Sequence, residues 1–208
     1  MPTEPLFLVG AGGHGLVVLD AIERAEGTSQ GVSIFDQSES RIGQKALDLI
    51  VQRFDPAASM KGRRFHVCIG SNTARARLVG VLAEAGGIPA TVIHPIATIA
   101  RSAVVGLGSF VAARGIVAPD AVVGEGAIIN HGTIVDHECI VGKFCHIAPG
   151  ATLAGNVRIG DRVMVGAGAN ILPGVRIGDD AIIGAGAVVT TDIPSRTTYA
   201  GVPARQIR

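Results

Sequence analysis

A six-residue repeat of aliphatic side chains runs through the second half of this 208-residue sequence. Every sixth residue from Ile93 to Val189 is Val, Ile or Leu, at all seventeen positions. This period matches neither a helix, which repeats every 3.6 residues, nor a single strand, which repeats every two. Each hexad therefore predicts one short flat side of a coil that stacks on its neighbours, which is a parallel β-helix.

A second feature of the hexads is a small or slim residue four positions after each aliphatic, which suits a second inward position in a narrow prism. Cys139 and Cys145 occupy two of these positions, so we expect both thiols to fill core volume rather than to react. Cys68 lies in an apolar run at 65–69, typical of a buried strand. Three cysteines are an odd count, which predicts no disulfide framework.

Charge and hydropathy exclude several classes of partner. Lys and Arg number 18 against 17 Asp and Glu, without a run of like charge, which argues against nucleic acid or anionic lipid. Gly and charged residues interrupt each apolar stretch before the roughly 18 residues that a membrane span needs. Residues 5–9 run straight into a glycine turn and do not resemble a secretory leader. We therefore expect a cytoplasmic protein.

The first ninety residues follow another pattern, in which apolar strands alternate with helices. Strands are predicted at 6–9, 32–35, 65–69 and 91–93. One helix is predicted after the glycine turn at 10–15, and another is expected to be capped by Asn72 or Thr73. Such alternation predicts a small parallel sheet with its ligand crevice at the carboxyl ends of the strands. We expect an α/β domain at 1–92, the coil at 93–194 and a tail at 195–208.

The glycine turn carries the clearest binding motif of the α/β domain. Gly10, Gly12 and Gly15 satisfy G-x-G-x-x-G. Asp36 follows where an acidic side chain would bind a ribose hydroxyl, as in a dinucleotide-dependent oxidoreductase with the coil as an assembly module. The physics is less specific, because a glycine turn at a helix N-terminus offers N–H groups to any diphosphate, including that of a nucleotide sugar. A packing turn without a ligand is the alternative.

Three histidines, His131, His137 and His146, fall within one 18-residue turn of the coil. Acidic residues flank His137, and a nearby carboxylate makes a neutral imidazole a stronger base, which suits proton abstraction near pH 7. A solvated corner histidine is the alternative. A metal shared between subunits is a third interpretation, but spacings of six and nine do not reproduce the close histidine pair of γ-class carbonic anhydrases.

The chain resembles the PglD/NeuD-type sugar acyltransferases of bacteria in the glycine turn at 10–15, in residues 135–142 around His137 and in residues 201–205. The resemblance covers nearly the whole length. It implies a Rossmann-like domain followed by a left-handed β-helix, in a homotrimer with active sites between subunits. It also implies transfer of an acetyl group from acetyl-CoA to the amino group of a nucleotide-linked sugar, for bacterial surface glycan synthesis. The tail at 195–208 would contact acetyl-CoA or a neighbouring subunit.

Roles for individual residues follow from the same resemblance. His137 corresponds to the general base, Glu138 to the neighbour that raises its basicity, and Gly155 to the N–H that stabilises the thioester oxyanion. The expected contacts with acetyl-CoA are His146, Gly155, Ala167 and Ala185. The expected nucleotide-sugar contacts are Gly12, Gly13, His14, Asp36, Gln37, Gly70 and Asn130.

Several alternatives to this function stay open. The same base would serve O-acetylation of a sugar hydroxyl, and the oxidoreductase described above or a non-catalytic trimeric scaffold that binds nucleotide sugars are the rivals. No metal is expected. The sequence does not identify the nucleotide base, the sugar or the acyl chain length.

Overall fold

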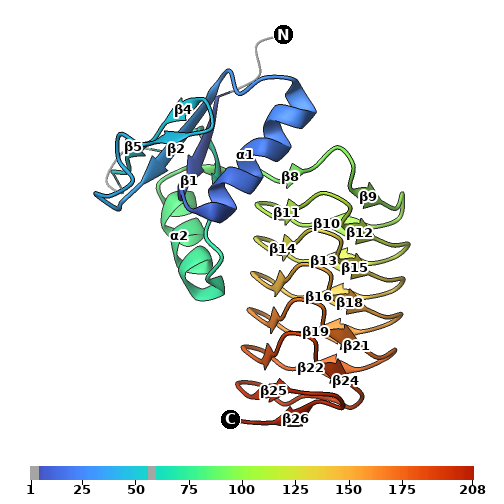
Figure 1. The fold of residues 1–208 in the computed structure, drawn as a ribbon. Coiled ribbons are helices and arrows are strands. Elements are labelled where there is room, and N and C mark those ends of the chain that lie inside the picture. The colour runs from blue at the N-terminus through green and yellow to red at the C-terminus, as the bar shows by residue number, and fades with distance from the viewer. Residues whose placement is uncertain (1–4, 56–59) are drawn as a thin grey trace.

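The computed structural model describes residues 5–55 and 60–208, which form an α/β domain followed by a parallel β-helix (Figure 1). The main sheet of the α/β domain has the strand order β5-β2-β1-β6-β7, with all neighbours parallel. Its strands are β1 (Leu6–Val9), β2 (Val32–Asp36), β5 (Gln52–Arg53), β6 (Arg64–Val67) and β7 (Ile88–Pro89). Strands β3 (Lys45–Ala46) and β4 (Leu49–Ile50) form an antiparallel pair in the segment after β2.

One helix covers each face of this sheet, because alternate residues of a strand point to opposite faces. Leu8 of β1 packs with α1 (Gly13–Glu26), whereas Val9 packs with α2 (Asn72–Glu84). The cap of α2 differs from the prediction. Ser71 is the N-cap, and its hydroxyl accepts the Ala74 N–H at 3.4 Å. Asn72 is the first residue of the helix, and its side chain bonds elsewhere.

The second half of the chain winds into three sheets of short strands, named here the β8, β9 and β10 faces. The β8 face contains β8 (Val92–Ile93), β11 (Phe110–Val111), β14 (Ile128–Ile129), β17 (His146–Ile147), β20 (Met164–Val165), β23 (Ile182–Ile183), β25 (Thr198–Ala200) and β26 (Arg205–Gln206). The β9 face contains β9 (Thr98–Ile99), β12 (Ile116–Val117), β15 (Ile134–Val135), β18 (Thr152–Leu153), β21 (Asn170–Ile171) and β24 (Val188–Val189). The β10 face contains β10 (Val104–Val105), β13 (Val122–Val123), β16 (Ile140–Val141), β19 (Arg158–Ile159) and β22 (Arg176–Ile177).

From β8 to β24, neighbouring strands of each face pair in parallel and lie one full turn apart, whereas Ile182 of β23 pairs with Thr198 of β25, 16 residues later, and β25 pairs antiparallel with β26. Val105 faces Val123 and Ile129 faces Ile147, so that partners are separated by 18 residues, or three hexads. The chain therefore passes three edges per turn: the β8/β9 edge, the β9/β10 edge and the β10/β8 edge. This is the fold class predicted from the sequence, an α/β domain followed by a left-handed β-helix of hexapeptide repeats.

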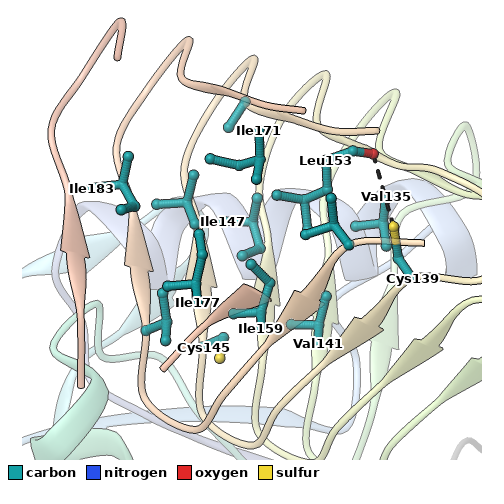
Figure 2. Close-up of a cluster of buried hydrophobic side chains, with 14 of the residues drawn as sticks. Val135, Cys139, Val141, Cys145, Ile147, Leu153, Ile159, Ile171, Ile177 and Ile183 are labelled. Atoms are coloured by element: carbon teal, nitrogen blue, oxygen red, sulfur yellow. Dashed lines mark hydrogen bonds between the residues drawn. The ribbon is translucent and has the colours of Figure 1, made fainter. Parts of the chain in front are cut away.

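The repeated aliphatics stack inside this prism, as Figure 2 shows for eight of them, labelled from Val135 to Ile183. Cys139 and Cys145 lie among them with no exposed surface. The first turn departs from the pattern. Ile93 is 39 % exposed and Ile99 is only partly buried. These residues belong to the end turn of the coil, which has no further turn above it.

An apolar cluster joins the two domains, in addition to the core inside the coil. Phe110 and Ile128 point outward from the β8 face, yet they are 0 % and 1 % exposed because α1 and the α/β sheet cover them. Further along the same face, His146 is half-buried and Ile182 is 47 % exposed. The α/β domain therefore covers the early turns of the β8 face and leaves the late turns open. Neither helix is long and apolar enough for a membrane span, within the described residues.

Candidate active site

The glycine turn opens onto a cavity of about 390 Å³ at the carboxyl ends of β1, β2 and β6. Two of its glycines are required by packing. A Cβ on Gly15 would overlap the Gly10 carbonyl oxygen, and one on Gly10 would lie 2.9 Å from the Cys68 carbonyl oxygen. Gly12 and Gly13 have no such neighbour, since nothing lies within 3.8 Å of a Cβ built there. Their open side faces the cavity, where a ligand can approach the backbone.

Six of the seven residues predicted to bind the nucleotide sugar line this cavity. They are Gly12, Gly13, His14, Asp36, Gln37 and Gly70. The turn is also the start of α1, whose N-cap Gly12 provides no side-chain hydrogen bond. The first N–H groups of α1 are therefore available to an anion at the positive end of the helix dipole.

Asp36 holds the turn in shape. Its Oδ2 atom accepts the Ala11 N–H at 2.7 Å, and its Oδ1 atom accepts the Ser38 N–H at 2.8 Å. Arg41 completes the arrangement from the opposite side by donating to the Ala11 carbonyl at 2.9 Å. Both Asp36 oxygens thus bind backbone N–H groups, so the carboxylate acts on the loop itself. The G-x-G-x-x-G motif does not indicate this loop-holding role, and Asp36 also lines the cavity.

His14 connects this cavity with the coil. Its ring meets Phe110 edge-on, with centroids 5.3 Å apart, and lies 6.5 Å from the His146 ring. Burial, reinforced by the neighbouring His66 and His146 side chains, lowers the pKa of His14 to about 3. Among the described residues, the buried Nε2 atom of this neutral ring has no hydrogen-bond partner. A buried unpaired nitrogen at a cavity is suited to a ligand.

His146 and Asn130 form a pair where β14 and β17 reach the β8/β9 edge. The Asn130 Nδ2 and His146 Nε2 atoms are 3.1 Å apart. Burial and the nearby Arg75 charge lower the pKa of His146 to about 4, against the opposing effect of a hydrogen bond with the Gly70 backbone. His146 is therefore a neutral side chain at the boundary between the α/β domain and the coil. Asn130 lies beside it, outside the cavity.

His137 lies on a different edge, the β9/β10 edge, and is exposed. Its Nδ1 atom is 3.2 Å from Glu138 Oε2, while Asp136 Oδ1 accepts its backbone N–H at 2.7 Å. The imidazole extends over Gly155, one turn further along the coil. A Cβ on Gly155 would lie 2.5 Å from both Cε1 and Nε2 of His137, so a larger residue there would displace the imidazole.

The main-chain groups predicted to contact acetyl-CoA also lie on edges. Gly155 follows β18 on the β9/β10 edge, and the exposed Ala167 and Ala185 lie on the β8/β9 edge. The Gly155 carbonyl accepts the Gly174 N–H, and the Ala167 carbonyl accepts the Gly186 N–H. Within the described part of the chain, the Ala185 carbonyl accepts no backbone N–H, and the N–H groups of all three residues have no acceptor. Three free N–H groups beside small side chains can bind the carbonyls and phosphates of an extended ligand.

Within one chain, the predicted residues therefore form two separate groups. The cavity belongs to the α/β domain, His146 to strand β17 of the β8 face, and Asn130, Ala167 and Ala185 to the β8/β9 edge. His137, Glu138 and Gly155 lie on the β9/β10 edge, one face of the prism away. In residues 5–55 and 60–208, no group of three or more His, Cys, Asp or Glu side chains is placed to hold a metal ion.

Sequence reasoning missed Arg41 and Arg75. Arg41 lines the cavity, and Arg75 is 1 % exposed between the two domains. Both bind mainly to backbone carbonyls. Carbonyl acceptors belong to every residue and leave no signature in a sequence, so no motif could have indicated these contacts.

Comparison with known proteins links both halves of the chain to carbohydrate acyltransferases. Residues 5–82 match the PglD N-terminal domain, and residues 156–191 match the bacterial transferase hexapeptide (six repeats). No match was found among curated proteins.

Two solved structures are similar over nearly the full length. The acetyltransferase domain of PglB from Neisseria gonorrhoeae, also solved with acetyl coenzyme A, is 33 % identical with a TM-score of 0.88; the alignment covers 99 % of this chain and 100 % of that one. PerB from Caulobacter crescentus, in complex with CoA and GDP-perosamine, is 34 % identical with a TM-score of 0.90, over 99 % of this chain and 98 % of that one. Variants of that N-acetyltransferase with one histidine replaced by asparagine or alanine also have CoA and GDP-perosamine bound.

Proposed function

Because the chain belongs to the PglD-type sugar N-acetyltransferases, we propose that it transfers the acetyl group of acetyl-CoA to the amino group of a nucleotide-linked amino sugar. The observation that carries this proposal is the coexistence of two arrangements in one chain. A glycine-turn cavity with helix N–H groups suits a nucleotide diphosphate, and a coil edge presents an exposed histidine above a glycine N–H.

The chemistry at the coil edge follows from the contacts of His137. We assign the ring proton to Nδ1, because Glu138 Oε2 is an acceptor 3.2 Å away, and this tautomer leaves Nε2 with its lone pair. The sugar amine attacks the thioester carbonyl carbon, and Nε2 takes the proton that the nitrogen loses. The Gly155 N–H stabilises the oxyanion that forms on the former carbonyl oxygen. When the C–S bond breaks, the same proton goes to the departing sulfur, giving free CoA and the acetamido sugar.

A complete site on this scheme needs two chains. The cavity, His146 and the β8/β9 edge lie on one side of the β9 face, and His137 lies on the other side, at the β9/β10 edge. We infer that the β9/β10 edge of one subunit meets the β8/β9 edge of the next, so that acetyl-CoA lies between Gly155 of one and Ala167 and Ala185 of the other. A closed ring of three such contacts is a homotrimer, the simplest cyclic assembly of heterologous interfaces that suits a three-sided prism.

The proposed activity can be tested with acetyl-CoA and GDP-, dTDP- and UDP-linked 4-amino-4,6-dideoxy sugars as acceptors. We expect release of the CoA thiol together with a mass gain of one acetyl group on at least one acceptor. The matched control is the nucleotide sugar with a hydroxyl in place of the amine, which should stay unmodified. Acetylation of the control alone would favour O-acetyl transfer, and no transfer to any acceptor would contradict the proposal.

Ligand stabilisation separates the rival classes. Acetyl-CoA and the active nucleotide sugar should each raise the Tm, because each binds the folded state alone. A Tm that rises with NAD and not with acetyl-CoA would favour an oxidoreductase.

His137→Ala provides the residue-level test. We expect kcat to fall by roughly 10²- to 10⁴-fold, the usual contribution of a general base. Binding of acetyl-CoA, measured by calorimetry, should stay nearly unchanged, since the thioester arm is held by main-chain groups. A variant with near-normal kcat would remove His137 from the mechanism.

A further inference from the structure

Arg75 of α2 links the α/β domain to the coil through its whole guanidinium group. Nε donates to the Gly126 carbonyl at 2.7 Å. Nη1 donates to the carbonyls of Ile69 at 2.9 Å and Gly70 at 3.2 Å. Nη2 donates to Phe144 O at 2.8 Å, to Cys145 O at 3.0 Å and to Asn72 Oδ1 at 2.9 Å.

These acceptors lie next to functional groups of both domains. On the α/β side, Ile69 and Gly70 follow β6 and line the nucleotide-sugar cavity. On the coil side, Phe144 and Cys145 lie on the β10/β8 edge and immediately precede His146. A single side chain therefore fixes the rim of the cavity against the segment that carries the half-buried histidine.

Asn72 strengthens the same link. Its amide Oδ1 accepts from Arg75, and its Nδ2 donates to the carbonyls of Arg162 at 2.9 Å and Val163 at 3.0 Å. Since those residues lie one turn below Phe144 on the same edge, the start of α2 is tied to two successive turns of the coil. The tie is polar and directional, unlike the apolar contact around Phe110.

The link depends on the shape of the guanidinium group as well as its charge. Burial lowers the pKa of Arg75 to about 10, which still leaves the group charged near neutral pH. Its five N–H donors lie in a fixed plane and reach carbonyls in three directions. A lysine ammonium has three donors at one point and cannot span the same acceptors.

We propose that Arg75 is a positioning residue for the transfer reaction. It fixes the nucleotide-sugar cavity relative to the coil, so that the sugar amine is held in one position for attack on the thioester carbonyl carbon. The proposal rests on the proposed function. Because Phe110 and Ile128 bury apolar surface between the domains independently of Arg75, loss of the guanidinium should loosen the Gly70 rim without separating the domains.

Kinetics with Arg75→Met and Arg75→Lys test this role, with Arg77→Met as the matched control from the exposed side of α2. The acceptor is whichever of the GDP-, dTDP- and UDP-linked 4-amino-4,6-dideoxy sugars turns over fastest. For both Arg75 variants we expect the acceptor KM to rise roughly tenfold or more, while the acetyl-CoA KM changes less than about threefold. Arg77→Met should match the wild type.

A merely structural role would give a different result. It would lower the Tm and the fraction of active protein, and both KM values would stay at the wild-type level. That outcome in a folded Arg75 variant overturns the proposal. If Arg75→Met does not fold, Arg75→Lys decides, because it keeps the charge and the apolar stem.

Hydrogen–deuterium exchange provides a readout that needs no substrate. In the Arg75 variants, peptides that cover 69–72 and 144–146 should exchange faster than in the wild type and in Arg77→Met. Unchanged exchange in both peptides overturns the proposal. Faster exchange without acetyl transfer by the wild-type protein would leave the positioning contact supported and the proposed function refuted, so the two failures are distinguishable.

Discussion

The imidazole of His137 lies over the Cα atom of Gly155, one turn of the coil below it. This contact leaves no room for a Cβ, which would lie 2.5 Å from both Nε2 and Cε1 of the ring. The base and the N–H proposed for the oxyanion are therefore neighbours by construction, since the 18-residue register stacks them on the same edge.

Gly155→Ala should accordingly displace the ring of His137. We expect kcat to fall by roughly 10²-fold, because a displacement of about 1 Å at a reacting group costs that much. Gly80→Ala is the control, since nothing lies within 4 Å of a Cβ at that helical position. It should keep full activity and raise the free energy of unfolding by up to about 1 kcal/mol. Equal kcat values for both variants would show that the ring position does not matter.

Asp36→Ala should loosen the glycine turn, because two backbone N–H groups would lose their carboxylate acceptor. We expect the KM for the nucleotide sugar to rise about tenfold, in line with the cost of one or two such hydrogen bonds. The KM for acetyl-CoA should not change. Asp20→Asn, at an exposed aspartate that pairs with Arg24 on α1, is the control. An unchanged nucleotide-sugar KM in Asp36→Ala would refute the loop-holding role.

Stability should decline in mild acid because burial, complete for His66 and partial for His14 and His146, holds three histidines neutral. Burial lowers the pKa of His14 to about 3 and those of His66 and His146 to about 4. Between about pH 6.5 and pH 4 the unfolded chain therefore binds protons that the folded chain does not, so the free energy of unfolding falls as the pH falls. The slope should approach roughly 1 kcal/mol per pH unit for each histidine.

Urea titrations at several pH values measure this slope. His66→Gln should reduce it, since one of the three depressed pKa values is removed. A free energy of unfolding that stays constant from pH 7 to pH 4.5 would contradict the prediction.

The three thiols should be inert in the folded protein. Burial raises the pKa of Cys145 to about 12 and also raises the pKa values of Cys68 and Cys139, so little thiolate forms at pH 8. We expect no reaction with an aromatic disulfide reagent while free glutathione reacts completely, and full reaction of all three thiols in urea. Fast labelling of the native protein would show that the coil opens.

The sequence predicted the coil well because its physics is periodic. A hexad repeat leaves few choices for which residues point inward, and Val111 to Val189 follow it. The end turn is the exception, since Ile93 has the pattern of a buried residue but lacks a covering turn. Periodicity describes the interior of a stack and carries no information about where the stack stops.

The cavity was predicted from one motif, but the hydrogen bonds that hold its loops were not. Gly12 and Asp36 were correctly placed together at the ends of the strands, but the sequence could not indicate that the carboxylate would bind Ala11 and Ser38. In the same way, Asn72 is a residue type that often caps helices, yet its side chain bonds to the coil across the domain boundary, and Ser71 is the N-cap. Short polar side chains have several partners within reach, and the tertiary arrangement decides among them.

The 18-residue pairing gives the coil a constant spacing between successive turns. Successive turns are about 4.8 Å apart, so residues 18 positions apart, such as Ala167 and Ala185, lie on the same edge one turn apart. Inserting or deleting one complete turn after Gly155 would therefore lengthen or shorten the edge proposed to bind acetyl-CoA, while the contact between His137 and Gly155 would stay unchanged.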